Sequence, residues 1–186
     1  MDRRQTLGLL LTLATRRVWA DDDEATATWV AVMRRGPVFG IDAVLKAPVA
    51  LRDAWAVLTD FDGMAAFVPN LESSRVVSTS GEALCVEQRG TLKWGPVSQP
   101  YSTVREVQVA PMETIRTTSV AGATPREQSL TRFKEVSGGT EIWHRAELAF
   151  KTWMPDYVAE RFLRDVMQER YEAIVAEMVR RAGAGR

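Results

Sequence analysis

Cysteine and histidine are almost absent from this chain, which has 186 residues but only one of each, Cys85 and His144. A single cysteine excludes a disulfide within the chain and every metal site built from several thiolates. One histidine and one cysteine are also too few for a typical zinc site, because zinc takes most of its ligands from these two residue types. We therefore expect no metal site.

Sequence motifs for several common chemistries are absent as well. The chain has no HExxH sequence, no P-loop and no GxGxxG turn for a dinucleotide. It also lacks the GxSxG turn that exposes a catalytic serine in α/β-hydrolases, and the residues around Cys85 do not match a cysteine protease. We expect no cofactor, and the motifs alone leave open whether the protein is an enzyme.

A long hydrophobic run is missing too. The apolar stretch at residues 7–14 is much shorter than the roughly 20 residues that a membrane span needs. It follows Arg3 and Arg4 and precedes Val18-Trp19-Ala20, which is typical of an export signal over residues 1–20. The arginine pair favours the twin-arginine route, with a Sec signal or a retained anchor as alternatives. We expect a periplasmic or secreted protein with no stable membrane span after signal removal.

Neither sign of charge is in large excess. The chain has 24 basic and 24 acidic residues, and removing residues 1–20 leaves 20 and 23, a formal charge of −3. A mildly acidic domain has no electrostatic reason to bind nucleic acid. Small and acidic residues predict a leader over 21–36, and the remaining residues 37–183 have the length of one domain.

What the chain does contain is a change of periodicity. A strand is predicted over 38–45, then a helix from Leu51 to the break at Asp62-Gly63, and a short helix over 64–68. From residue 71 to 150, apolar and polar side chains alternate between glycine or proline turns. Sequential strands with short turns are typical of an antiparallel meander.

The C-terminal segment is the clearest helix. Pro155 and Asp156 form a typical helix start, and the apolar pattern continues to Arg181. A helix of roughly 25 residues with one apolar face must cover the sheet. The order β-α-α-β₆-α therefore predicts an α+β fold in which about seven antiparallel strands curl around this helix and leave a hollow. The predicted apolar arc contains Phe162, Leu163, Val166, Met167, Tyr171, Ile174 and Met178.

Three stretches resemble one protein family. They are "VLKAPVALRDAWAVLTDFDGMAAFVPNLESSRVV", "FKEVSGGTEIWHRAELAF" and "WMPDYVAERFLRDVMQERYEAIVAEM". They are similar to the opening segment, the final hairpin and the closing helix of the SRPBCC superfamily, also called START-like or helix-grip proteins. The nearest branches are the polyketide cyclase/dehydrase and coenzyme Q-binding groups. The resemblance covers roughly residues 40–180 and implies a helix-grip fold with a ligand cavity under the helix.

The only histidine, His144, lies on the apolar side of the last predicted strand, with Ile142, Ala146 and Leu148. It is either a core residue with a local partner or a polar group that faces a cavity. The resemblance places this strand against the cavity. We favour packing or ligand positioning over proton transfer, so His144 is only a weak catalytic candidate.

Three more polar side chains are candidates for the cavity. Strand alternation places Gln88 and Arg105 on faces that can point inward. Arg170 lies within the apolar arc of the helix, where a guanidinium needs a carboxylate, carbonyl oxygens or an anionic ligand. We favour a structural role for Arg170, either an ion pair, which Glu177 on the same side would suit, or a head group that reaches the helix edge.

Apolar residues complete the predicted lining: Met64, Phe67, Val86, Leu92, Phe133, Ile142, Phe162, Val166 and Met167. With sparse polar groups, such a lining favours a module that binds a lipid, a quinone or an aromatic metabolite. The alternative is an enzyme of the polyketide cyclase/dehydrase type that uses the same cavity, with His144 and Arg105 or Arg170 as its polar groups. A third interpretation is contact with a protein partner through Trp143 and Trp153.

Overall fold

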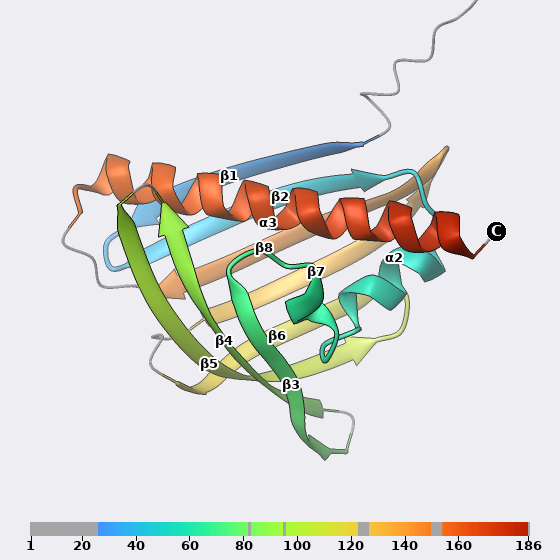
Figure 1. Ribbon diagram of the computed structural model, residues 1–186, viewed down its shortest axis with the longest axis horizontal. Helices are drawn as coiled ribbons and strands as arrows, with labels where there is room; N and C mark the ends of the chain where they lie inside the picture. Colours follow the sequence, from blue (N-terminus) through green and yellow to red (C-terminus); the bar gives the residue numbers. More distant parts are fainter. Residues whose placement is uncertain (1–25, 82, 95, 123–126, 150–153, 186) are drawn as a thin grey trace, which may run out of the picture.

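Eight antiparallel strands form one curved sheet, and a long C-terminal helix crosses its concave face (Figure 1). The strands are β1 (Ala27–Arg35), β2 (Val38–Ala47), β3 (Leu71–Ser80), β4 (Ala83–Trp94), β5 (Val97–Ala110), β6 (Thr114–Gly122), β7 (Glu127–Val136) and β8 (Gly139–Ala149). The helices are α2 (Leu51–Leu58), the 3₁₀ turn η1 (Met64–Ala66) and α3 (Asp156–Ala184). This computed structural model describes residues 26–81, 83–94, 96–122, 127–149 and 154–185, so the expected export signal lies outside the described residues.

The strand order in the sheet is β1-β2-β8-β7-β6-β5-β4-β3. Strands β3 to β8 follow one another as neighbours, which confirms the predicted meander. Because α2 and η1 carry the chain from β2 to the far edge of the sheet, β2 is free to pair with β8, from Val38 opposite Ala149 to Ala47 opposite Thr140. The predicted α+β helix-grip fold is therefore confirmed, with one strand more than expected.

The additional strand is β1, whose residues were assigned to the leader. It pairs with β2 from Ala27 opposite Lys46 to Arg35 opposite Val38. Residues 29–33 are all apolar, so they lack the polar and apolar alternation that located the other strands. Side chains of α3 bind the outer edge of β1, since Gln168 donates to the Thr28 carbonyl at 3.0 Å and the Arg34 N–H donates to Glu160 at 2.7 Å. These contacts cover part of an exposed strand edge.

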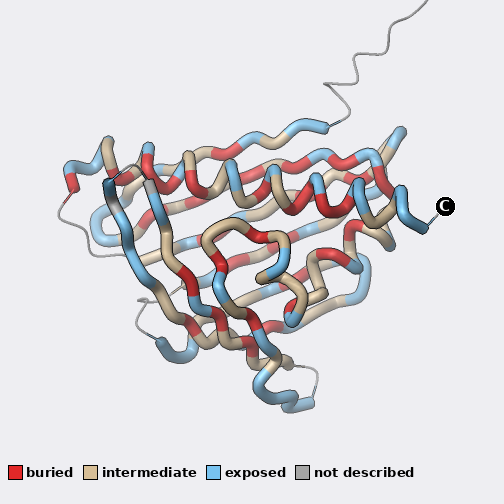
Figure 2. Tube along the Cα trace, viewed as in Figure 1, coloured by how far each residue is buried: buried red, intermediate tan, exposed pale blue. Residues whose placement is uncertain are grey.

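The helix α3 lies on the sheet with the apolar face that its sequence predicts. Its side toward the sheet is largely buried (Figure 2). Near the start of α3, Phe162 packs with Phe39 of β2, and both side chains are 0% exposed. Near its end, Arg181 pairs with Asp60 at 2.8 Å and its guanidinium lies over the Phe67 ring. Within the described residues, no helix combines the length and the apolarity of a membrane span.

A β-bulge interrupts the pairing of β5 with β6 near the end of β6. Val104 lies opposite Ala121, but the next residue, Arg105, lies opposite Ser119, so Val120 is an extra residue. A bulge of this kind bends a strand and redirects nearby side chains, and bulges are frequent beside functional sites. Here it lies next to Arg105, a charged side chain that lines the cavity.

Candidate ligand-binding site

A cavity of about 400 Å³ lies between the concave face of the sheet and α3. Every strand except β1 contributes to its walls, together with α2, η1 and α3. Aliphatic and aromatic side chains make up most of the lining, including Ile41, Val86, Val107, Leu163 and Ile174. The hollow predicted between sheet and helix is therefore present, and its size and composition are typical of small-molecule sites.

Polar side chains gather on one wall, formed by β5, β6, β7 and β8. They are Thr103, Arg105, Thr117, Glu127, Ser129, Thr131 and His144. Alternate residues of a strand face the same side, so successive inward positions on neighbouring strands place these groups side by side. Several of them pair within the wall, such as the hydroxyls of Thr117 and Ser129, which are 2.7 Å apart.

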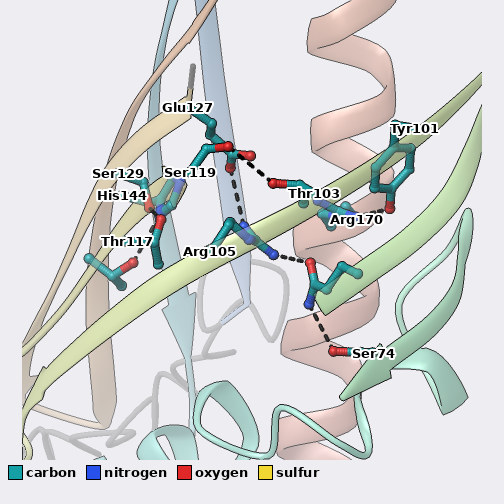
Figure 3. Close-up of polar contacts among 12 residues, drawn as sticks. Ser74, Tyr101, Thr103, Arg105, Thr117, Ser119, Glu127, Ser129, His144 and Arg170 are labelled. Carbon is teal, nitrogen blue, oxygen red and sulfur yellow. Dashed lines mark hydrogen bonds and ion pairs between the residues drawn. The ribbon is translucent and has the colours of Figure 1, made fainter. Parts of the chain in front are cut away.

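Arg105 is the central charged group of this wall (Figure 3). Its Nη1 donates to Glu127 Oε1 at 3.2 Å, and its Nη2 donates to Gln88 Oε1. Gln88 in turn donates from Nε2 to the Ser74 hydroxyl at 3.0 Å. The third nitrogen, Arg105 Nε, is buried and has no hydrogen-bond partner among the described residues. Because each Nη carries two N–H groups and makes one of these bonds, the guanidinium retains N–H donors for another group.

His144 is held in one orientation on the same wall. Its Nδ1 lies 2.9 Å from the Thr131 hydroxyl, and its ring lies against the Tyr171 ring of α3, with centroids 5.5 Å apart. The pKa of His144 is lowered from 6.5 to about 4, chiefly by burial; Glu127 acts in the opposite direction, and Arg105 and Arg170 add to the lowering. His144 lines the cavity, and the lowered pKa leaves its ring neutral at pH 7.

The lowered pKa of His144 predicts a loss of stability in mild acid. The unfolded chain binds a proton at this residue below pH 6.5, whereas the folded chain does so only below about pH 4. The free energy of unfolding should therefore fall by about 3 kcal/mol from this group as the pH drops through that window. Urea unfolding at several pH values should show a shallower fall for His144→Gln, and equal slopes for both proteins would contradict the prediction.

Arg170 lines the cavity from α3 and reaches β5 at the edge of the polar wall. Its Nη2 donates to the Tyr101 hydroxyl at 3.0 Å, and that hydroxyl donates to the Asn70 carbonyl at 3.4 Å. The suggested partner, Glu177, instead accepts hydrogen bonds from Arg180 and Arg181 at 2.6 Å. Those bonds lower the pKa of Glu177 to about 2. The suggested ion pair between Arg170 and Glu177 is therefore not formed.

The structure brings eight of the thirteen predicted lining residues to the cavity. They are Met64, Val86, Gln88, Leu92, Arg105, His144, Met167 and Arg170. The other five, Phe67, Phe133, Ile142, Phe162 and Val166, pack in or beside the hydrophobic core instead. Phe133, for example, lies against Trp55, with ring centroids 5.2 Å apart. Of the two tryptophans considered for a protein contact, Trp143 lies beneath Lys134, and Trp153 is outside the described residues.

Sequence reasoning missed several polar members of the wall, above all Glu127. The available signal was the alternation of β7, because Phe133 was placed inward and Thr131, Ser129 and Glu127 are the next positions on the same side. All three line the cavity. Tyr101 and Thr103 precede Arg105 at alternate positions of β5, so the same alternation places them on its face of the strand, and both also line the cavity.

Comparisons with known proteins agree with this architecture. A family model described as polyketide cyclase/dehydrase and lipid transport matches residues 47–175. No curated protein matches the chain.

Solved structures share the fold at low sequence identity. A STAR-related lipid transfer protein from Xanthomonas axonopodis superposes with a TM-score of 0.65 at 13% identity, covering 86% of this chain and 97% of that one. The Zhui aromatase/cyclase from Streptomyces sp. R1128 has a TM-score of 0.63 at 12% identity, covering 77% and 95%. These neighbours agree with the START-like resemblance. Because the family model spans well over half of the chain, the protein belongs to the polyketide cyclase/dehydrase and lipid transport family.

Proposed function

We propose that this protein binds one hydrophobic small molecule, such as a lipid, a quinone or an aromatic metabolite, between the sheet and α3. The observation that carries the proposal is the cavity of about 400 Å³, whose lining is mainly apolar with most of its polar groups on one wall. Burial of apolar ligand surface would supply affinity at about 25 cal/mol per Å². The polar wall would set the orientation of the ligand.

A neutral fluorescent probe tests the proposal. N-phenyl-1-naphthylamine, whose emission rises in apolar surroundings, should bind the purified protein saturably with one site per chain. Ala146, which lines the cavity on β8, should be replaced by phenylalanine to fill part of the space. We expect Ala146→Phe to weaken probe binding about 10-fold or more, because a filled cavity excludes the ligand. Unsaturable binding, or equal affinity in a folded Ala146→Phe variant, would contradict the proposal.

A cyclase or dehydratase in the same cavity is the second candidate. His144 favours it, because this residue lines the cavity and its Nε2 has no hydrogen-bond partner among the described residues. A pKa of about 4 makes His144 a weak base at pH 7, however, whereas an efficient general base has a pKa near the working pH. Binding is therefore the better-supported function. If turnover of a polyketide-like substrate is found, His144→Ala should lower it at least about 100-fold.

Export of the domain is part of the proposal. Residues 1–20 carry the arginine pair, the short apolar run and the small residues of an export signal. Fractionation of cells that express the full chain should recover the protein outside the cytoplasm. Equal cytoplasmic recovery of the full chain and a chain without residues 1–20 would contradict export.

A further inference from the structure

We infer that the ligand of this cavity carries one negative charge, and that Arg105 and Arg170 select it; this inference rests on the proposed function. The first argument is the balance of charge. Within the part of the chain that the structure describes, the charged side chains that line the cavity are Arg105, Arg170 and Glu127. His144 adds no charge at pH 7, because burial keeps its ring neutral. The described lining therefore has one positive charge more than it has negative charges.

The second argument is the unused donor capacity of the two guanidinium groups. Arg105 has 16% of its side chain exposed, and each of its two Nη atoms carries two N–H groups but makes one hydrogen bond among the described residues. Arg170 has one hydrogen bond there, to the neutral hydroxyl of Tyr101. A guanidinium has five N–H donors and matches a carboxylate through two parallel bonds. Both side chains can thus donate to an acidic group without losing the bonds they already make.

The third argument is the placement of the two arginines on different elements that line the same cavity. Arg105 comes from β5 of the sheet, and Arg170 comes from α3 (Figure 3). The apolar lining between and beside them would hold the hydrocarbon part of the same molecule. A buried cation is costly without a counter-charge, so an anionic group on the ligand would supply what the protein lacks. The chemistry that fits is a monoanionic amphiphile, such as a carboxylic acid with an aromatic or aliphatic body.

Two probes that differ only in charge test this inference. N-phenyl-1-naphthylamine is neutral, and 8-anilino-1-naphthalenesulfonate has the same ring system with one sulfonate. Arg170→Gln should raise the dissociation constant of the sulfonate about 10-fold or more, because a hydrogen bond to a charged group is lost. It should change that of the neutral probe less than about 2-fold. Arg116→Gln, which removes an exposed positive charge from the opposite face of the sheet, should change neither.

Glu127→Gln provides the converse test. Glutamine keeps an acceptor oxygen for Arg105 but removes the negative charge of the wall, so the sulfonate should bind several-fold more tightly. Equal effects of Arg170→Gln on both probes, or no effect of either variant on the preference between them, would overturn the inference while leaving the proposed function intact. Failure of both probes to bind the wild-type protein would contradict the proposed function, and the inference with it.

Discussion

Replacing Phe162 with alanine should lower the free energy of unfolding by about 3–5 kcal/mol, which is the usual cost of removing a buried phenylalanine ring. Phe162 is 0% exposed and joins α3 to Phe39 of β2, alongside Leu163 and Val166. The loss should be large because the rest of this cluster is held by the sheet on one side and by the helix on the other, so it has little freedom to close the gap. Urea or guanidinium denaturation followed by circular dichroism would measure it.

Tyr157 of the same helix is the matched control. Its side chain is 74% exposed, so Tyr157→Ala should change the free energy of unfolding by less than about 0.5 kcal/mol. A loss for Phe162→Ala no larger than that for Tyr157→Ala would show that α3 is not held on the sheet by this cluster. It would also put the cavity in doubt, since α3 forms one of its walls.

Replacing Arg105 with methionine should cost about 3 kcal/mol of stability, although the cavity would remain open. Glu127, which has 22% of its side chain exposed, would lose the positive charge beside it, and Gln88 would lose a donor. Removing one partner of a largely buried ion pair leaves an uncompensated charge, and this is the main reason for the penalty. Denaturant titration of the purified variant is the measurement.

The double variant Arg105→Met, Glu127→Leu separates this cause from a loss of packing. Replacing both charges with apolar groups removes the uncompensated carboxylate, so the double variant should recover to within about 1 kcal/mol of the wild type. If its loss instead equals the sum of the two single losses, the two side chains do not interact energetically. In that case the Arg105–Glu127 contact would have no role in forming the polar wall.

Most of the fold was predictable because its strands carry a local signal. Where one face of a strand is apolar and the other polar, the alternation shows the strand, and glycine or proline shows the turn. This signal correctly placed β2 to β8 in the chain. It failed for β1, since residues 29–33 are apolar on both faces: Val30 is buried, whereas Trp29 and Met33 are exposed.

The sequence predicted which side chains face the interior, but not which of them line the cavity. Periodicity correctly predicted that Phe162 and Ile142 face the interior, yet both lie in the packed core. Whether an inward side chain meets a neighbour or an empty space depends on how far the sheet curves away from α3, and one strand or helix alone does not carry that information. The pairing of Arg105 with Glu127 could not be predicted for a similar reason. It depends on how β5, β6 and β7 lie together in the sheet, since β6 separates the other two strands.

The lining residues of α3 give the length of the cavity along the helix axis. Its lining residues extend from Leu163 to Ile174, and eleven steps of 1.5 Å in an α-helix correspond to about 16 Å. Beyond the two ends of this stretch, α3 contacts the rest of the domain: Phe162 packs with Phe39, and Arg181 pairs with Asp60. The length of this stretch therefore limits the ligand. A ligand longer than about 16 Å along the helix axis must bend or leave one end outside the cavity.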